Sequence, residues 1–478
     1  MERILTLEQM RSADRFTIEN LGVSEEILVE RAGHAVADVI KARFLGGRVL
    51  VCIGKGKNGE DGRIIAEILS KTHGFTVSTI NVFNGILKMF DKKYDIIVDC
   101  ILGTGLNRDV EGKYKAAIEK INASNSFVVA CDIPSGLNGD TGKVMGAAVK
   151  ADLTVAIQEY KTGHFLGDGP DYSGELVCKD IGISIWGDDY IKRLRDVDAA
   201  RLFSHRQRNV HKGNFGKACV IGGSKNYTGS VVLSANALCA MKMGAGYSNL
   251  VVPESLFNAY VGKVPECTLM SISDNENGII FDENSLKQLF KYDSIAIGMG
   301  MGDSEGVYLS IKYLIENYTG NLIIDADGLN AISKYGVDVL LNKKCTIVLT
   351  PHIGEFVRLT KIEKDEILSD IIKSAVDFAT KYQVILVLKN AVSIITDGEQ
   401  IFFNTSGTSG MAKAGSGDVL SGFIAGLLAR CDDVLEAVTV ANHVFGKAGE
   451  LAVSSQNEFT VTASDIIEYL PVAINALV

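Results

Sequence analysis

The chain has 478 residues, of which 47% are hydrophobic and 22% charged, so it has the composition of an ordinary globular protein with a large core. Its length predicts two or more domains. The formal net charge of -10 excludes a chain-wide basic surface for nucleic acid, and an anionic substrate would need local devices such as backbone amides, helix N-termini or a bound cation.

The cysteines and the N-terminus point to a cytoplasmic protein. Nine cysteines are present, none of them in Cys-x-x-Cys spacing, and the odd number fits no disulfide framework. We therefore expect buried free thiols in a reducing compartment. The first residues lack the apolar stretch of a secretory signal, and no segment reaches about 18 consecutive apolar residues, so no membrane span is predicted.

The first 200 residues alternate short β-rich runs with helical patterns. A helix is expected over 64–69, and strands are expected at 48–53, 75–82, 94–99 and 127–132. Strands that are apolar on both faces and separated by helices predict a parallel, doubly wound Rossmann-like sheet. Ligands of such sheets bind at the carboxyl ends of the strands.

Glycine-rich turns and carboxylates follow three of these strands. The loop Gly54–Gly62 leads from the first strand into a helix, and its glycines let backbone amides approach an anion. Asp99 ends another strand before Gly103-Thr104-Gly105-Leu106, and Asp132 precedes Ile133-Pro134-Ser135-Gly136. The carboxylates, together with Asp140 nearby, are suited to a hard cation or to general acid/base chemistry, although each alone is also typical of a turn or cap.

These residues resemble the N-terminal domain of the YjeF family, the NAD(P)H-hydrate epimerases. The resemblance implies a potassium ion bound by Asn58, Asp99 and Ser135, and Asp132 as the catalytic residue. It also implies a substrate site lined by Asp132 with Lys57, Asn58, Gly59, Glu60, Asp61, Gly103, Thr104, Gly105 and Leu106. The family pattern has Asn and Gly where this chain has Lys57 and Glu60. Glu60 adds a negative charge beside an anionic ligand, and Lys57 is expected to offset part of it.

Residues 186–212 are charged and lack a long apolar run, so we interpret them as the connection between domains 1–205 and 206–478; a surface helix inside one domain is the alternative. The alternation of strands and helices then restarts. Strands are expected at 217–221, 294–297, 321–325, 346–349 and 384–388. This pattern predicts a second, larger α/β domain.

The turn Gly415-Ser416-Gly417-Asp418 is the strongest functional signal in the chain. A helical pattern follows it, with an apolar face at Leu420, Phe423, Ile424, Leu427 and Leu428. The turn therefore lies at a helix N-terminus, where free amides favour a phosphate or a developing oxyanion. Asp418 is placed to contact a hydroxyl nucleophile, or it caps the helix.

Such a turn resembles the ribokinase-like fold, in which the glycines form an anion hole and the Asp is the catalytic base. Further motifs are similar to the C-terminal domain of the YjeF family, an ADP- or ATP-dependent NAD(P)H-hydrate dehydratase; they lie at 211–216, 222–224, 298–302, 325–330 and 350–355. The resemblance implies a substrate site with Gly300, Gly302, His352 and Asp418. It also implies a nucleotide site with Lys389, Asn390, Ala391, Val392, Ser393, Gly415, Ser416 and Gly417. The family usually has Lys-Gly where this chain has Lys389-Asn390, and we expect the loop to keep its shape because Asn tolerates left-handed backbone.

Together the two resemblances cover nearly the whole chain and imply a bifunctional enzyme that repairs hydrated NADH and NADPH. The first domain would interconvert the R and S hydrates with potassium, and the second would dehydrate the S form with ADP or ATP and magnesium. No nucleic acid or membrane partner is expected, whereas a homo-oligomer is. The alternative is a ribokinase-like small-molecule kinase whose N-terminal module binds nucleotide without epimerase activity.

Overall fold

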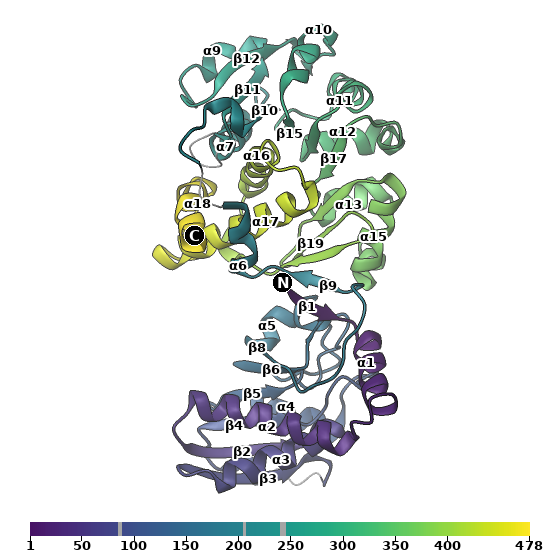
Figure 1. Ribbon diagram of the computed structural model, residues 1–478, viewed down its shortest axis with the longest axis vertical. Helices are drawn as coiled ribbons and strands as arrows, with labels where there is room; N and C mark the ends of the chain where they lie inside the picture. The colour runs from purple at the N-terminus through teal and green to yellow at the C-terminus, as the bar shows by residue number, and fades with distance from the viewer. Residues whose placement is uncertain (85–87, 204–206, 240–244) are drawn as a thin grey trace. The chain divides into compact units, whose positions relative to one another are not determined.

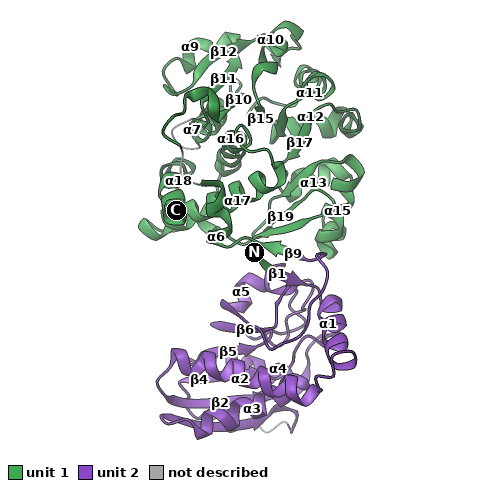
Figure 2. Ribbon diagram, in the orientation of Figure 1, with its two compact units in different colours: residues 1–2, 191–478 green, residues 3–190 purple. Residues whose placement is uncertain are grey.

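The computed structural model describes the chain except residues 85–87, 204–206 and 240–244 (Figure 1). Its contacts divide it into two compact units (Figure 2). The N-terminal unit is residues 3–190, and the C-terminal unit is residues 191–478 with the first two residues. Residues 191–203 therefore group with the C-terminal unit, whereas the sequence placed the boundary at 205/206. No described helix is long and apolar enough to cross a membrane.

The N-terminal unit is built on a parallel sheet with the strand order β3-β2-β4-β5-β6-β8. Its strands are β2 (Gly47–Ile53), β3 (Phe75–Asn81), β4 (Ile96–Cys100), β5 (Phe127–Cys131), β6 (Leu153–Ile157) and β8 (Glu175–Lys179). A separate parallel pair joins β1 (Glu2–Leu5) to β7 (Tyr160–Lys161). The helices are α1 (Leu7–Glu19), α2 (Glu25–Arg43), α3 (Lys57–Lys71), α4 (Gly112–Asn122) and α5 (Gly169–Ser173).

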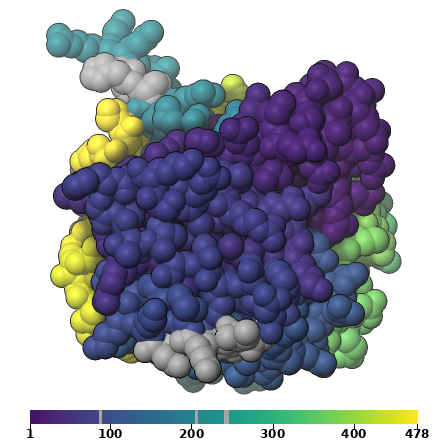
Figure 3. Space-filling model, turned by 90° about the horizontal axis from the view of Figure 1, so that it is seen from below, coloured from purple at the N-terminus to yellow at the C-terminus, as the bar shows by residue number. Residues whose placement is uncertain are grey.

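Each face of this sheet has its own apolar core. Val49 and Val51 of β2 pack with Ile65 of α3 in one core, which also takes in α2. Leu50 and Cys52 point the other way, into a core that contains residues of α4. The alternation follows from the two-residue period of a strand, and burial on both faces explains the continuous apolar run that the sequence shows here. In the space-filling view, residues of this unit, coloured purple to blue, form one continuous surface (Figure 3).

The C-terminal unit has the strand order β12-β11-β10-β15-β16-β17-β18-β19-β20-β9. The pairs from β12 to β18 are parallel, β18-β19-β20 is antiparallel, and β9 is parallel to β20. The strands are β9 (Ile191–Arg193), β10 (Lys217–Gly222), β11 (Tyr247–Pro253), β12 (Thr268–Ile272), β15 (Ser294–Met299), β16 (Asn321–Ile324), β17 (Thr346–Leu349), β18 (Ile385–Leu388), β19 (Ser393–Thr396) and β20 (Ile401–Asn404). A short hairpin, β13 (Asp274–Asn275) with β14 (Gly278–Ile279), lies outside this sheet.

Helices flank the sheet of the C-terminal unit. They are α6 (Asp196–Ala199), α7 (Thr228–Leu238), α9 (Phe257–Tyr260), α10 (Glu283–Lys287), α11 (Glu305–Asn317), α12 (Asp327–Tyr335), α13 (Ile353–Thr360), α14 (Lys364–Ser369), α15 (Ile371–Tyr382), α16 (Ser416–Leu428), α17 (Val434–Ser455) and α18 (Ala463–Leu477). The mixed α/β class predicted from the sequence is confirmed in both units.

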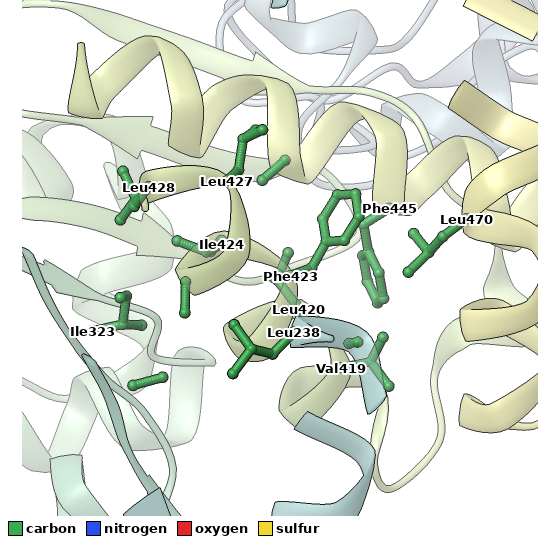
Figure 4. Close-up of a cluster of buried hydrophobic side chains, with 14 of the residues drawn as sticks. Leu238, Ile323, Val419, Leu420, Phe423, Ile424, Leu427, Leu428, Phe445 and Leu470 are labelled. Carbon is green, nitrogen blue, oxygen red and sulfur yellow. The ribbon is translucent and has the colours of Figure 1, made fainter. Parts of the chain in front are cut away.

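Helix α16 is the buried centre of the C-terminal unit. Phe423, Ile424 and Leu427 are fully buried, and Figure 4 shows them clustered with Phe445 and Leu470 of the neighbouring helices. A Cβ at Gly422 would lie 2.0 Å from the Ser234 carbonyl oxygen of α7, so the two helices approach each other closely only because this residue is glycine. The packing fixes the N-terminus of α16, which carries the predicted phosphate turn.

Candidate active sites

In the N-terminal unit, the glycine-rich loop after β2 leads directly into α3. A Cβ at Gly54 would lie 1.7 Å from the Ile101 carbonyl oxygen, and one at Gly59 would lie 2.2 Å from the Gly54 carbonyl oxygen. Only glycine allows this close packing of the β2–α3 loop and the segment after β4. The predicted binding residues 57–61 therefore form the first turn of α3 at the carboxyl end of the sheet.

The three residues expected to bind potassium meet in one buried network. The Ser135 amide and hydroxyl donate to the two Asp99 carboxylate oxygens at 2.8 and 2.6 Å. The Asn58 side-chain amide donates to the Leu102 carbonyl oxygen at 2.8 Å, and the Leu102 amide donates to the Ser135 hydroxyl, also at 2.8 Å. Three segments distant in sequence thus converge on one cluster of oxygen atoms.

This cluster has the chemistry of a cation site. The Asn58 side-chain oxygen is buried without a hydrogen-bond partner, although buried polar atoms are nearly always paired. Burial raises the pKa of Asp99 to about 6, against the hydrogen bonds from Ser135 and Ile101 that lower it. A cation would satisfy the unpaired oxygen and favour the charged carboxylate. Among the described residues no group of three or more His, Cys, Asp or Glu forms a metal site, so a cation here would rely on amide, hydroxyl and carbonyl oxygens.

Asp132 lies beside this cluster in strained backbone, with a φ of 68°. Its carboxylate forms an ion pair with Lys161, whose side chain is 2% exposed, and accepts a hydrogen bond of 3.1 Å from the Ile157 amide. His164 bonds the Asp132 carbonyl oxygen at 3.0 Å, and burial, then Lys161, lowers the pKa of His164 to about 4. The buried lysine and the neutral histidine hold Asp132 in one orientation.

The first turn of α3 adds a second carboxyl group to this site. Burial, followed by the nearby charges of Asp132 and Glu60, raises the pKa of Asp61 to about 8, so Asp61 is protonated at neutral pH. Lys57 contacts Glu25 at 2.5 Å and Asp14 at 3.8 Å. Its ammonium group therefore pairs with carboxylates of α1 and α2. Glu60 raises the pKa of Lys57 less than these partners do, so Lys57 offsets the Glu60 charge only weakly.

The loop after Asp99 lies over the same site. A Cβ at Gly103 would lie 3.3 Å from the Asn58 Cβ, and Arg11 of α1 donates to the Thr104 carbonyl oxygen at 3.3 Å. The Leu106 amide donates to the Gly103 carbonyl oxygen, which closes the turn, and Gly105 has open space at its Cα. Asp140 instead accepts from the Leu7 amide at 2.7 Å, which is a structural role at the start of α1.

In the C-terminal unit, the turn 415–418 opens α16 as the sequence predicts. Gly415 is the N-cap, with a left-handed φ of 96°, and Ser416 is the first helical residue. Asp418 is the third residue of the helix, so the alternative that it caps the helix is wrong. The first amides of a helix have no intrahelical acceptor and favour an anion, although the Ser416 amide here donates to the Lys413 carbonyl oxygen at 3.3 Å.

An ion pair between a partly buried lysine and a buried aspartate lies directly beside this turn. The Lys389 ammonium donates to Asp325 at 2.9 Å, and the Ser421 hydroxyl donates to the other Asp325 oxygen at 2.6 Å. A Cβ at Gly417 would lie 3.1 Å from the Lys389 ammonium nitrogen. Burial alone would lower the pKa of Lys389, but Asp325, Glu355 and Asp418 outweigh it and raise that pKa. A fixed positive charge is therefore held against the glycines.

Asp418 is a carboxylate poised for proton transfer. Burial raises its pKa to about 6, against a hydrogen bond from the Ser230 hydroxyl that lowers it. The Ser234 hydroxyl donates to the Asp418 backbone carbonyl at 2.8 Å. A base with a pKa just below neutral is largely ionised at pH 7 and still able to accept a proton.

His352 begins α13 and has a local structural role. Its Nδ1 accepts from the Glu355 amide at 3.2 Å, and the Glu355 carboxylate accepts from the His352 amide at 2.8 Å. The ring remains 55% exposed, and burial followed by Lys389 lowers its pKa. Burial raises the pKa of Glu355 to about 7. The capping box fixes the ring beside Glu355, whose carboxylate also lies 3.6 Å from His352 Nε2.

The remaining predicted residues surround the same turn or the strand ends next to it. Gly300 and Gly302 have φ of 68° and 75°, and the Gly302 amide donates to Asp327 at 2.8 Å. A Cβ at Gly300 would lie 3.0 Å from the Ser230 Cβ, which connects this loop to Asp418. Residues 389–393 connect β18 to β19, and the Lys389 amide donates to the Pro351 carbonyl oxygen. Asn390 has no positive φ, so the loop does not need glycine there.

Sequence reasoning missed four participants. Lys161 follows a strand that was not predicted, and Ser230 lies in the first turn of a helix that was not predicted. Asp325 and Glu355 belong to recognised motifs but were given no role. A polar residue one to six positions beyond a buried strand is the signal that would have found Lys161, Asp325 and Glu355.

The fold and the two sites define an enzyme that joins a Rossmann-like domain to a ribokinase-like domain. The family model for NAD(P)H-hydrate dehydratase matches residues 218–472, and the model for the YjeF-related protein N-terminus matches 25–85 and 81–163. The bifunctional NAD(P)H-hydrate repair enzyme Nnr of Thermofilum pendens is 33% identical over 99% of this chain and 97% of its own. The chain belongs to this family of bifunctional NAD(P)H-hydrate repair enzymes.

Other relatives and solved structures agree. The Nnr enzyme of Moorella thermoacetica is 30% identical, covering 99% of this chain and 97% of its own. The ADP/ATP-dependent NAD(P)H-hydrate dehydratase of Bacillus subtilis, crystallised with ATP and magnesium, covers 59% of this chain and 98% of its own at 25% identity and a TM-score of 0.51. A ribokinase-like protein of Enterococcus faecalis has the same fold, with a TM-score of 0.52 and 23% identity. The full-length matches favour the bifunctional interpretation over the small-molecule kinase.

Proposed function

We propose that the C-terminal unit dehydrates the S hydrates of NADH and NADPH with ADP or ATP, and that the N-terminal unit interconverts their R and S forms. The observation that carries the proposal is the arrangement at α16. A carboxylate with a pKa of about 6, a helix N-terminus and a partly buried lysine meet at one glycine turn. These are the groups that phosphoryl transfer to a hydroxyl requires.

The dehydration would proceed in two steps. Hydroxide is a poor leaving group, so the C6 hydroxyl oxygen of the hydrate first attacks the terminal phosphorus of the nucleotide. Its proton passes to Asp418, and the bond from that phosphorus to the bridging oxygen breaks, which releases AMP from ADP or ADP from ATP. The amides at Gly415–Gly417 and the Lys389 ammonium group would hold the charge of the phosphoryl group as it moves. The lone pair of the ring nitrogen then expels phosphate, and loss of a proton from the adjacent ring carbon restores the double bond.

Residues 389–393 would contact the nucleotide, and Gly300, Gly302 and His352 would contact the hydrated nicotinamide. Magnesium usually binds proteins through one or two carboxylates together with substrate phosphates. It would therefore enter with the nucleotide and neutralise phosphate charge.

Epimerisation requires a bond at C6 to open and to close again on the other face of the ring. Asp132 would move the proton that this exchange needs, while Lys161 and His164 hold its orientation. Residues 57–61 and 103–106 would line the substrate. Asn58, Asp99 and Ser135 would hold potassium, which supplies a positive charge that organises the site for an anionic ligand. We further propose a cytoplasmic location and a homo-oligomer.

The central experiment incubates the purified chain with mixed NADH hydrates and either ADP or ATP. Absorbance of intact NADH should return for both hydrates, because epimerisation feeds the R form into dehydration. Recovery of the S form alone would disprove the N-terminal activity, and no recovery with either nucleotide would disprove the proposal for the C-terminal unit. Repeating the assay in potassium and in sodium tests the cation, since only epimerisation should respond.

A further inference from the structure

A cavity of the C-terminal unit lies at the amino ends of the strands, whereas the site at α16 lies at their carboxyl ends. It measures about 530 Å³ and is lined by His211, Lys212, Gly213, Lys217, Tyr247, Ser248, Thr268, Lys291 and Tyr292. We call it the amino-end pocket, because Lys217, Tyr247 and Thr268 are the first residues of β10, β11 and β12. These strands are parallel. The six residues of β10 separate the pocket from Gly222 by about 17 Å.

The pocket concentrates positive charge in a chain whose net charge is -10. Three lysines line it. The ammonium groups of Lys212 and Lys217 lie 4.7 and 5.9 Å from the centre of the Tyr247 ring, and that of Lys291 lies 5.4 Å from the Tyr292 ring. Within the described ranges, none of the three ammonium groups forms an ion pair with a carboxylate. The carboxylate of Asp293 lies close by and accepts from the Lys217 backbone amide at 2.7 Å. Three lysines still outnumber it, so an anion in the pocket would be attracted.

Hydrogen-bond donors point to the same kind of ligand. Ser248 also lines the pocket, but it is 4% exposed and its buried hydroxyl bonds the Cys267 thiol, which lowers the pKa of that thiol against the effect of burial. The Gly213 amide donates to His211 Nδ1 at 3.1 Å, so the neutral ring carries its proton on Nε2 and can donate it. A phosphate group accepts several such bonds at once.

The wall that carries Lys212 is firmly packed. The short 3-10 helix Lys212–Phe215 starts with a capping box between His211 and Asn214. A Cβ at Gly246 would lie 1.6 Å from the Lys212 carbonyl oxygen, and one at Gly216 would lie 1.7 Å from the Ala429 carbonyl oxygen. The motif 211–216 has no part in the proposed reaction. Its close packing instead holds a lysine and a histidine over the pocket.

We propose that the amino-end pocket is a second ligand site, which binds a nucleoside phosphate. The lysines and His211 take the phosphate, and the partly exposed Tyr247 ring takes the flat base. A cavity of this size falls within the usual range for small-molecule sites. The site is separate from the proposed catalytic nucleotide site, and it does not depend on the proposed reaction.

Calorimetric titration of the full chain with ADP tests the proposal. The unaltered chain should bind two equivalents of ADP, one at the carboxyl ends of the strands and one in the amino-end pocket. Lys212→Gln/Lys291→Gln should lose one equivalent, or weaken it at least tenfold, while ADP-dependent dehydration is unchanged. The matched control Lys312→Gln/Lys373→Gln removes the same charge from two exposed helices and should keep both equivalents.

A second titration, with pyrophosphate, separates the phosphate from the base. Tyr247→Leu should weaken ADP at the pocket several-fold and leave pyrophosphate unchanged. Equal binding of ADP and pyrophosphate would overturn the role of the base. Binding that the control pair weakens as much as the pocket pair, or no second equivalent at millimolar ADP, would overturn the site itself. Thermal melts of each variant exclude a folding defect.

Discussion

The two units each place a carboxylate near a buried or partly buried lysine, but they pair the two groups differently. In the N-terminal unit, Lys161 pairs with Asp132, the predicted catalytic residue itself. In the C-terminal unit, Lys389 pairs with Asp325, and Asp418, the carboxylate that we propose as the base, takes a hydrogen bond from Ser230 instead. The ion pair fixes the orientation of the Asp132 carboxylate, whereas burial raises the pKa of Asp418 to about 6, which suits it to accept a proton.

The two units also differ in the source of the positive charge that would face an anionic substrate. The C-terminal unit uses the N-terminus of the thirteen-residue helix α16 with Lys389 beside it. The N-terminal unit gathers oxygen atoms around Asn58, whose unpaired side-chain oxygen suits a cation. One site therefore carries its positive charge permanently, whereas we propose that the other takes a cation from solution.

The strongest test of the comparison is Asp418→Asn. Removing a general base lowers a rate by about 10²–10⁴-fold, so dehydration of the S hydrate should almost disappear. Epimerisation, followed by the approach of R and S hydrates to equilibrium, should be unchanged. Asp365→Asn, at an exposed position in α14, is the control for loss of a charge. Dehydration within threefold of the unaltered chain would show that Asp418 is not the base.

The reciprocal test replaces the pair in the N-terminal unit. Asp132→Asn should abolish epimerisation and spare dehydration. It should also destabilise the fold by about 3–5 kcal/mol, because it leaves the Lys161 charge buried without its partner.

The double variant Asp132→Asn/Lys161→Met separates these two effects. It should recover most of the melting temperature but none of the epimerisation. If the double variant epimerises, the pair is structural only and the comparison between the units fails.

Some residues in these tests could be predicted from the sequence, and others could not. The turn 415–418, the strand-end carboxylates Asp99 and Asp132 and the α/β class could be predicted, because local period and turn chemistry specify them. Lys161 could not, since its meaning depends on β6 bringing it beside Asp132 from 29 positions away. The N-cap alternative for Asp418 failed for a related reason, because the left-handed Gly415 starts the helix three residues earlier.

Strands were missed where neighbouring elements, rather than the local pattern, decide the structure. Residues 153–157 and 175–179 lie at one side of the first sheet, and 247–253, 268–272, 393–396 and 401–404 flank the predicted strands of the second. Several are short, and β18, β19 and β20 form antiparallel pairs within a sheet that is otherwise mostly parallel. A rule that expects only parallel strands separated by helices passes over such a meander.

A smaller effect is expected from Ser230→Ala. The Ser230 hydrogen bond favours the charged form of Asp418, so its loss should raise that pKa above about 6. The base works only when ionised, and the acid limb of the rate profile for dehydration should therefore move upward by about half a unit to one unit. The rate should fall several-fold at pH 6 and hardly change at pH 8. Ser230→Thr, which keeps the hydroxyl, should restore the profile; an equal loss at both pH values would mean that Ser230 acts through packing.

The smallest expected effect concerns Glu60, where the N-terminal unit departs from its family. Glu60 is exposed in the first turn of α3, next to the proposed site of an anionic ligand. Two like charges near a surface repel by only about 0.5–1 kcal/mol, so Glu60→Gln should lower the KM for epimerisation by about two- to fivefold. The decrease in KM should become smaller at high salt, because salt screens the Glu60 charge. Glu67→Gln, two turns further along the same helix, should leave the KM unchanged. A rise in KM for Glu60→Gln would instead make Glu60 a ligand of the substrate, so that its departure from the family pattern would alter recognition and not merely weaken it.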